Sequence, residues 1–339
     1  MGSQRVRTSF KVTAYNEGGE GFPSEIVSIG VPAEGSVSEA VLIVNNFDRV
    51  SGPAYFDGED RAGFDNTIDS GVADRRDITF IGEMYNFRRA DEWITNSRPG
   101  FGASYSDLAG NIVAGNTFDY AAVHGKAMLE AGHAFYSCSN ERFTSDSLFC
   151  DSAWTIDLVC GKQVTTRVGD VQKYTVFYPE MQTALEKAAG RGTHLIVSGA
   201  YIATDIWDSI YPIEIDEDAR SKASTFAKDV LGYKFVTNQA SRRATVKPTV
   251  NKAVSGMPSV KIVGEMNPHQ YCVESPDGIA PASKAGQVIY RYADSNVSAA
   301  VVYEGKGYRC VSYGFPIEAL EGESTINKLI IKTLEYIKK

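Results

Sequence analysis

The sequence predicts an α/β fold with a doubly wound, mostly parallel sheet. Continuous apolar runs at residues 40–46 and 155–161 are typical of strands that are buried on both faces. Segments with helical periodicity alternate with such runs, which predicts a parallel sheet covered by helices. A third short run, 195–197, leads through Ser198-Gly199-Ala200-Tyr201 into an expected helix, the strand–turn–helix geometry on which open α/β folds often build a site.

Composition limits the possible partners. The chain has 339 residues, of which 43% are hydrophobic and 22% are charged, so it is expected to bury a large core. A net charge of −8 argues against a nucleic acid or an anionic membrane as partner. No apolar run approaches the roughly 20 residues that span a bilayer, so we expect no membrane insertion. The five cysteines form no CxxC pair, and we expect neither a metal nor another cofactor.

The N-terminal residues are expected to form a separate hairpin. Residues 8–15 alternate polar and apolar side chains, 16–21 form a glycine-rich turn, and 23–29 supply a second strand. The run Val12-Thr13-Ala14-Tyr15-Asn16, followed by that turn and Pro23-Ser24-Glu25, resembles the last hairpin of a fibronectin type III domain. We therefore expect such a hairpin at 1–32, a linker at 33–38, and an α/β domain at 39–339. The resemblance implies that the chain is the C-terminal part of a longer multidomain protein.

The α/β domain contains a long insertion at about residues 51–116. This segment is rich in Gly, Asp, Asn and aromatic residues and has one short strand candidate at 77–81, so we expect a functional elaboration. The remaining elements expected in chain order are a helix at 119–131, strands at 132–138 and 155–161, a helix at 179–189, a strand at 195–198 and a helix at 216–231. Short strands near residues 234, 246, 260, 288, 299 and 309 predict a β-rich extension, and 323–338 closes the chain as an amphipathic helix.

Two motifs give a family resemblance. The turn reads Val197-Ser198-Gly199-Ala200-Tyr201, and a late strand leads into Phe315-Pro316-Ile317-Glu318. In this order of elements they resemble the class I glutamine amidotransferase-like fold, in which a Gly-x-Cys-x-Gly turn carries the nucleophile and a Phe-His-Pro-Glu motif carries its base. The matching positions here hold neither Cys nor His. Since acyl transfer by that route needs both groups, amidotransferase activity is not expected.

Several longer runs give a second resemblance. They are residues 44–49, 99–105, 115–120, 198–201 and 204–208. Together they resemble a family of secreted, multidomain bacterial proteins labelled xanthan lyase. The resemblance implies a secreted, periplasmic or cell-surface location and glycan-related work. It does not assign catalytic residues.

A nucleophile is available at a predicted strand end, and a base is available in the predicted helix 119–131. Cys138 ends a predicted strand, where it would face the crevice in which open α/β folds bind ligands. His124 would serve as its base, and Asp119 would orient that base. The alternative is that Cys138 packs as a small hydrophobic residue and that His124 lies on the surface.

Polar residues near other strand ends could line one pocket. These candidate ligand-binding residues are Asn45, Asp48, Arg49, Asn116, Thr117, Ser198, Thr204 and Asp205. Ordinary helix caps and turns are the alternative explanation. The insertion adds many aromatics, among them Tyr105, which could form either a platform for sugar rings or a small local core.

The sequence therefore favours an accessory or glycan-binding domain of a secreted envelope or polysaccharide-processing protein. Its expected partners are a polysaccharide or the glycan of peptidoglycan, and other modules of the same parent chain. The alternative is a hydrolase or lyase that acts on polysaccharide or peptidoglycan. It would use Cys138 with His124, or Tyr105 and His124 with Arg49 or Arg98.

Overall fold

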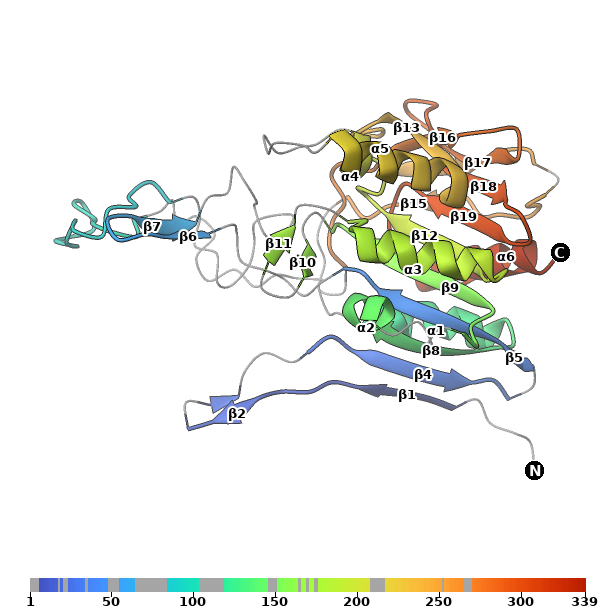
Figure 1. Ribbon diagram of the computed structural model, residues 1–339, viewed down its shortest axis with the longest axis horizontal. Coiled ribbons are helices and arrows are strands. Elements are labelled where there is room, and N and C mark those ends of the chain that lie inside the picture. Colours follow the sequence, from blue (N-terminus) through green and yellow to red (C-terminus); the bar gives the residue numbers. More distant parts are fainter. Residues whose placement is uncertain are drawn as a thin grey trace.

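A computed structural model gives the fold (Figure 1). It describes residues 6–17, 19–20, 24–33, 36–47, 55–64, 84–103, 119–145, 151–163, 166–168, 171–173, 176–207, 217–251, 253–264 and 270–339. Within these ranges, no helix combines the length and apolar character that a bilayer crossing requires.

The described residues form one large mixed sheet of eleven strands. The five central strands, β8, β5, β9, β12 and β19, run parallel, as the buried apolar runs predict. Antiparallel strands extend the sheet on both sides of this centre. In spatial order the strands are β1 (Val6–Phe10), β4 (Val27–Val31), β8 (His133–Ser139), β5 (Ser36–Asn45), β9 (Thr155–Gly161), β12 (His194–Gly199), β19 (Arg309–Tyr313), β18 (Ser298–Glu304), β17 (Gly286–Tyr292), β14 (Thr245–Pro248) and β15 (Val260–Lys261).

Four short pairs of strands lie outside the large sheet. They are β2 (Tyr15–Asn16) with β3 (Gly19–Glu20), β6 (Tyr55–Asp57) with β7 (Ala62–Phe64), β10 (Thr166–Val168) with β11 (Val171–Lys173), and β13 (Tyr233–Thr237) with β16 (Gly278–Pro281). The expected β-rich extension is therefore present, with β13, β14, β15, β17, β18 and β19 at the predicted places.

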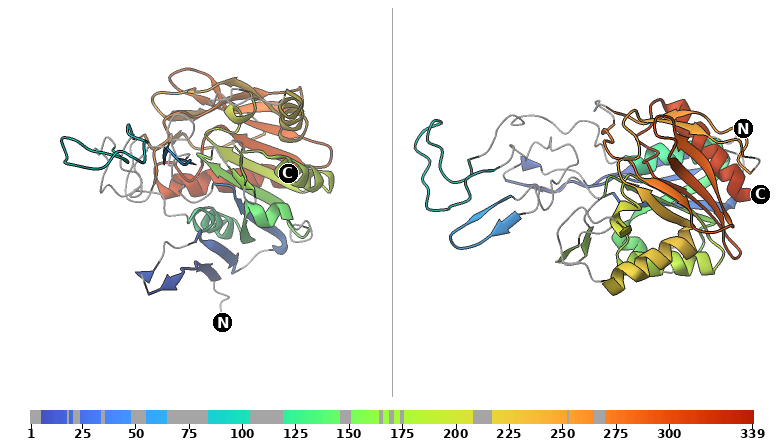
Figure 2. Two further views of the ribbon diagram at one scale, coloured as in Figure 1. Left: turned by 60° about the vertical axis from the view of Figure 1, so that its left-hand side comes forward. Right: turned by 90° about the horizontal axis from the view of Figure 1, so that it is seen from above.

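Helices cover both faces of the sheet, which confirms the doubly wound arrangement (Figure 2, right). On one face lie α1 (Tyr120–Glu130) and α6 (Glu323–Lys338). On the other lie α2 (Asn140–Ser145), α3 (Pro179–Gly190), α4 (Thr204–Trp207), α5 (Glu217–Phe226) and a π-helical segment (Ala227–Leu231). Strand β9 is buried at every position because it has helices on both sides.

The N-terminal strands belong to the large sheet. Strand β1 pairs with β4, and β4 pairs antiparallel with β8. The Ser28 amide donates to Ser137 Oγ at 2.7 Å. A side chain at Gly30 would come within 2.4 Å of the Phe135 ring, so glycine permits the close packing here. The described residues show this hairpin as an edge of the α/β sheet, and its assignment to a fibronectin type III domain stays a prediction.

Part of the long insertion forms an arm, by which we mean residues 55–64 and 84–103. The arm projects away from the sheet (Figure 1). Its two segments are joined by the Ala62 amide, which donates to the Phe87 carbonyl at 3.0 Å. The Tyr85 amide donates to the Ala103 carbonyl at 2.9 Å. The strand predicted at 77–81 lies outside the described residues.

Candidate functional site

The most unusual polar group in the structure is a buried histidine between two carboxylates. His124 Nδ1 donates to Asp157 Oδ2 at 2.6 Å, and His124 Nε2 lies 3.5 Å from Glu318 Oε2. The three side chains are at most 2% exposed. They come from α1, from the middle of β9, and from the segment after β19. The Tyr271 hydroxyl donates to Glu318 Oε1 at 2.6 Å.

The carboxylates make His124 a cation. Burial alone would lower the pKa of His124, but Asp157 and Glu318 outweigh that effect and raise the pKa to about 10. Burial, and after it Glu318, raise the pKa of Tyr271 well above its ordinary value, so its phenol keeps the proton that it donates. The cluster is thus an imidazolium held by two carboxylates at a junction of three segments.

A layer of aromatic rings lies beside this cluster. Phe47 stacks on Tyr120 with 5.5 Å between ring centroids and meets Tyr271 edge-on at 5.2 Å. The Lys162 ammonium lies 5.6 Å from the centroid of the Tyr271 ring and pairs with Glu274 at 3.0 Å. Tyr120 and Tyr271 are 3% and 5% exposed, and His124 is fully buried. A polysaccharide chain therefore has no route to His124 in this conformation.

Cys138 lies on the opposite face of the sheet from His124. Side chains alternate along β8, so that Phe135 points toward α1 while Cys138 joins the apolar cluster of Leu42 and Phe143 on the α2 side. This geometry corrects the expected catalytic pairing of Cys138 with His124. Asp119, the third expected member, sits at the N-terminus of α1, and the ring nitrogens of His124 face Asp157 and Glu318 instead.

The turn after β12 is filled by the chain's own groups. Ser198 and Ala200 are fully buried. Asp277 Oδ2 accepts hydrogen bonds from the Ala203 amide at 2.6 Å and the Thr204 amide at 2.8 Å, and the Thr204 hydroxyl donates to Asp277 Oδ1. Burial raises the pKa of Asp277 to about 7 despite these bonds. The backbone donors beside the turn are therefore satisfied from within.

The expected ligand-binding residues that the structure describes do not meet at an open rim. Thr204 binds Asp277, as described, and the Asp205 carboxylate accepts from the amides of residues 176 and 177 at 2.8 and 3.2 Å. Asn45 is 6% exposed, and its Oδ1 accepts from the Phe47 amide at 3.3 Å. These contacts fit the alternative of caps and turns. The remaining predicted residues, Asp48, Arg49, Tyr105, Asn116 and Thr117, lie outside the described residues.

Sequence reasoning missed Asp157, Tyr271 and Asp277. Asp157 did carry a signal, since it is an acid inside a run that was expected to be buried on both faces. A buried carboxylate needs a partner, so the run itself predicts a cation or a set of donors nearby. Tyr271 and Asp277 lie in loops that had no local pattern to mark them.

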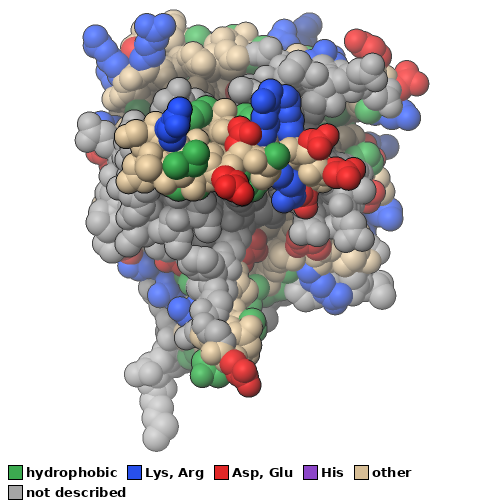
Figure 3. Space-filling model, turned by 90° about the vertical axis from the view of Figure 1, so that its left-hand side faces the viewer, with side chains coloured by type: hydrophobic (Ala, Val, Ile, Leu, Met, Phe, Trp, Pro, Cys, Tyr) green, Lys and Arg blue, Asp and Glu red, His purple; other side chains and the backbone are tan. Residues whose placement is uncertain are grey.

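The arm exposes large aromatic side chains. Trp93 is 56% exposed, Tyr85 51% and Phe56 37%. Phe87 supports Phe56, with 5.4 Å between ring centroids. Figure 3 views the molecule from the side on which the arm projects, and the described side chains in sight there include apolar, basic and acidic groups. The arm therefore carries three exposed aromatic side chains on one projecting segment.

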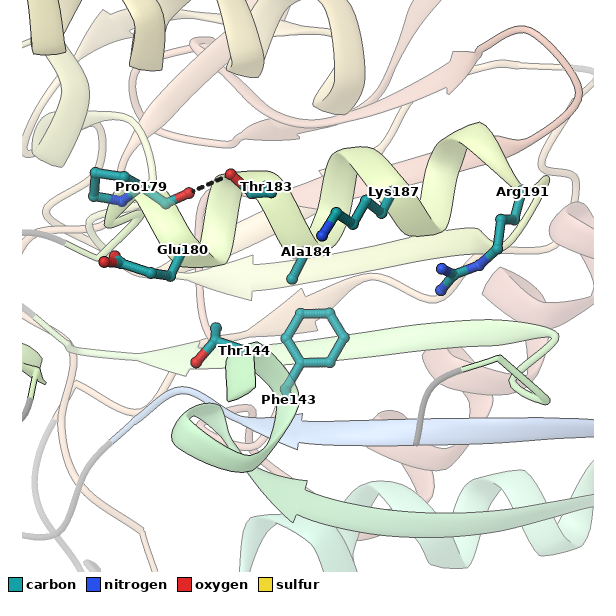
Figure 4. Close-up of a pocket in the computed structure, with 8 residues that line it drawn as sticks. All are labelled: Phe143, Thr144, Pro179, Glu180, Thr183, Ala184, Lys187 and Arg191. Carbon is teal, nitrogen blue, oxygen red and sulfur yellow. Dashed lines mark hydrogen bonds between the residues drawn. The ribbon is translucent and has the colours of Figure 1, made fainter. Parts of the chain in front are cut away.

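A pocket of about 240 Å³ lies elsewhere, between α2 and α3 (Figure 4). Its lining residues are Phe143, Thr144, Pro179, Glu180, Thr183, Ala184, Lys187 and Arg191. Arg191 already pairs with Asp151 at 3.1 Å. The pocket is on the α2 side of the sheet, away from His124. The described part of the chain has no group of three or more His, Cys, Asp or Glu side chains arranged to hold a metal ion.

No protein-family model and no curated protein matches this chain. Among solved structures, it is similar to a GH42 β-galactosidase from G. stearothermophilus, with 12% identity over 67% of this chain and a TM-score of 0.39. It is also similar to a ThuA-like protein from Bacteroides uniformis, with 11% identity over 65% of this chain and 83% of that one, and a TM-score of 0.39. A glutamine amidotransferase from Methylobacillus flagellatus has 8% identity over 57% of this chain and 64% of that one, with a TM-score of 0.33.

The match to the β-galactosidase covers only 27% of that protein's length. At these identities and TM-scores the similarities say nothing about substrate or activity.

Proposed function

We propose that this chain is an accessory, glycan-binding domain of a secreted or envelope protein, without acyl-transfer activity at the turn after β12. One observation carries the proposal: the arm exposes Trp93, Tyr85 and Phe56 to solvent. Sugar rings present apolar C–H faces, and aromatic rings offer them rigid, flat contact surfaces. Aromatic groups at such exposure on a projecting segment are suited to that contact.

The backbone of the arm holds Trp93 next to a tight turn. The Arg98 amide donates to the Thr95 carbonyl at 2.9 Å, and the Ile94 amide donates to the Arg98 carbonyl at 3.3 Å. Elsewhere in the arm, Asn86 Nδ2 donates to Asp91 Oδ2 at 3.0 Å. The arm therefore combines exposed rings with polar groups, the two kinds of contact that a sugar needs.

The resemblances drawn from the sequence supply the rest of the proposal. The turn at Ser198-Gly199-Ala200 and the late Glu318 fit descent from an amidotransferase-like fold that lacks the thiol and imidazole. The likeness of the longer runs to proteins labelled xanthan lyase supports the extracellular setting. The N-terminal hairpin, if it derives from a fibronectin type III domain, fits a modular parent protein.

The hydrolase or lyase alternative has less support. Cys138 and His124 lie on opposite faces of the sheet, and His124 is closed off from solvent. The version that uses Tyr105 with Arg49 or Arg98 stays a prediction, since Tyr105 and Arg49 lie outside the described ranges.

Affinity electrophoresis against soluble polysaccharides, with pull-down on insoluble glycans and peptidoglycan, tests the proposal. Wild-type protein is expected to be retarded by at least one glycan. Trp93→Ala and Tyr85→Ala are each expected to weaken binding about 2- to 10-fold, from a ring contact of about 0.5–1.5 kcal/mol.

Tyr15→Ala is the matched control, because Tyr15 is an 82% exposed aromatic outside the arm. Equal binding by the Trp93 and Tyr15 variants would refute the arm as the binding surface. Release of unsaturated sugar ends or of peptides from these substrates would refute the non-enzymatic function.

A further inference from the structure

The N-terminal hairpin presents an exposed apolar face. In the pairing of β1 with β4, Val6 faces Val31, Thr8 faces Ile29, and Phe10 faces Val27. Directly opposed residues of an antiparallel pair point to the same side. These six side chains therefore form one surface, the hairpin stripe. Its apolar members remain substantially exposed: Val6 58%, Phe10 58%, Ile29 48%, Val31 45% and Val27 41%.

The stripe lies on the α2 side of the sheet. Ile29 pairs with Tyr136 of β8, and Tyr136 packs against the apolar cluster on that side. Among the described helices, α2 covers β8 and β5 there, whereas Figure 1 shows β4 and β1 beyond it with no helix in front of them. On the other side of the hairpin, Ser28 and Gly30 of β4 are buried toward α1, while Arg7 and Ser9 of β1 are exposed.

We propose that the hairpin stripe packs face to face on the stripe of a second copy of this chain, forming a two-fold dimer. No member of the stripe is charged, so a chain with net charge −8 can approach its copy there without opposing acids at the contact. A two-fold contact uses the same patch on both copies, and a stripe of apolar side chains is complementary to itself. Two stacked hairpins would form a small sandwich in which both stripes lie inside.

The area sets the strength of this dimer. Five apolar side chains, each about half exposed, offer on the order of 400 Å² per copy, or about 800 Å² in all. Stable interfaces bury about 1,200–2,000 Å². The dimer is therefore weak and reversible, with a dissociation constant in the micromolar range or above.

Sedimentation velocity from about 1 μM to about 1 mM protein tests the proposal. The average mass is expected to rise from one chain toward two as the concentration increases. Ile29→Lys places an ammonium in each stripe at the contact and is expected to raise the dissociation constant at least about 10-fold. Val236→Lys is the matched control, because Val236 is a 46% exposed valine of β13, outside the hairpin. Circular dichroism checks that each variant folds.

A cysteine cross-link tests the geometry independently of charge. Thr8→Cys lies in the stripe and is expected to give a covalent dimer under mild oxidation, above the background of the wild-type cysteines. Ser9→Cys points to the opposite face and is expected to give only that background. A wild-type chain that stays monomeric throughout, equal dimerisation of the Lys variants, or equal cross-linking at positions 8 and 9 would each overturn the proposal. A stripe that serves a different protein would produce the first of these results.

Discussion

Replacing His124 by glutamine removes the cation that lies between Asp157 and Glu318. The variant leaves two buried carboxylates without their shared partner. Breaking a buried ion pair in this way costs about 3–5 kcal/mol, because the remaining charge stays desolvated. The rise in the pKa of His124 from 6.5 to about 10 corresponds to at most about 5 kcal/mol, which agrees with that range. We therefore expect His124→Gln to lower the free energy of unfolding at pH 7 by about 3–5 kcal/mol.

The wild-type protein should also lose stability as the pH rises. Because its pKa is higher in the folded state, His124 holds its proton in the folded chain after the unfolded chain has lost it. Its contribution is complete below about pH 6.5 and is lost as the pH rises through about 10. Through His124 the free energy of unfolding should fall by about 1.2 kcal/mol between pH 7 and 8, and Asp277, whose pKa burial raises to about 7, adds a smaller fall.

Guanidinium unfolding followed by tryptophan fluorescence measures both effects. His133→Gln is the control, because burial lowers the pKa of His133 and the residue is neutral across this pH range. The control should leave the slope between pH 7 and 8 unchanged. A wild-type stability that is flat over this interval, or a cost of less than about 1 kcal/mol for His124→Gln, would refute the charged cluster.

Three further changes test the packing and the filled turn. Asp277→Ala leaves two buried backbone amides without an acceptor and should cost about 2–4 kcal/mol in urea unfolding, whereas Asp277→Asn keeps an acceptor and should cost less. Burial raises the pKa of Asp277 to about 7 in the folded chain, so between about pH 4 and 7 the unfolded chain has lost a proton that the folded chain still holds. The free energy of unfolding should therefore fall as the pH rises through this range, and Asp277→Asn should remove that dependence. Gly125→Ala would place a methyl group 2.2 Å from the Phe135 ring and should cost about 1–3 kcal/mol, with partial rescue by Phe135→Leu in thermal unfolding. Tyr271→Phe removes the donor to Glu318 and should cost about 1–3 kcal/mol; an unchanged midpoint would count against that hydrogen bond.

The central strands and the long helices were predictable because their patterns are local. The run 155–161 became β9 with the same bounds, and the apolar spacing at 323–338 became α6. Pro179 marked the start of α3, since proline suits the first turn of a helix. In these segments the burial of an apolar face contributes most of the stability, and the spacing of apolar residues in the sequence identifies that face.

The buried cluster was not predictable in the same way. His124 meets Asp157 and Glu318 only after the sheet has formed, and no local spacing links the three residues. Whether Cys138 faces α1 or α2 depends on which residues of β8 point to which side of the sheet. When both faces of a strand are buried, apolar residues occupy both sets of positions, and the sequence does not distinguish the two sides. The N-terminal hairpin had a clear local pattern, but that pattern fits an edge of a sandwich and an edge of an α/β sheet equally well.

The position of β12 in the sheet has a consequence for synthesis of the chain. One edge of β12 pairs with β9, which precedes it in the chain, and the other edge pairs with β19. Leu195 pairs with Cys310, so this second edge cannot form its hydrogen bonds until residue 310 has left the ribosome. At roughly 5–20 residues per second, this wait lasts on the order of ten seconds. During that time an apolar strand edge is open to aggregation, so the nascent polypeptide should need a chaperone to shield it.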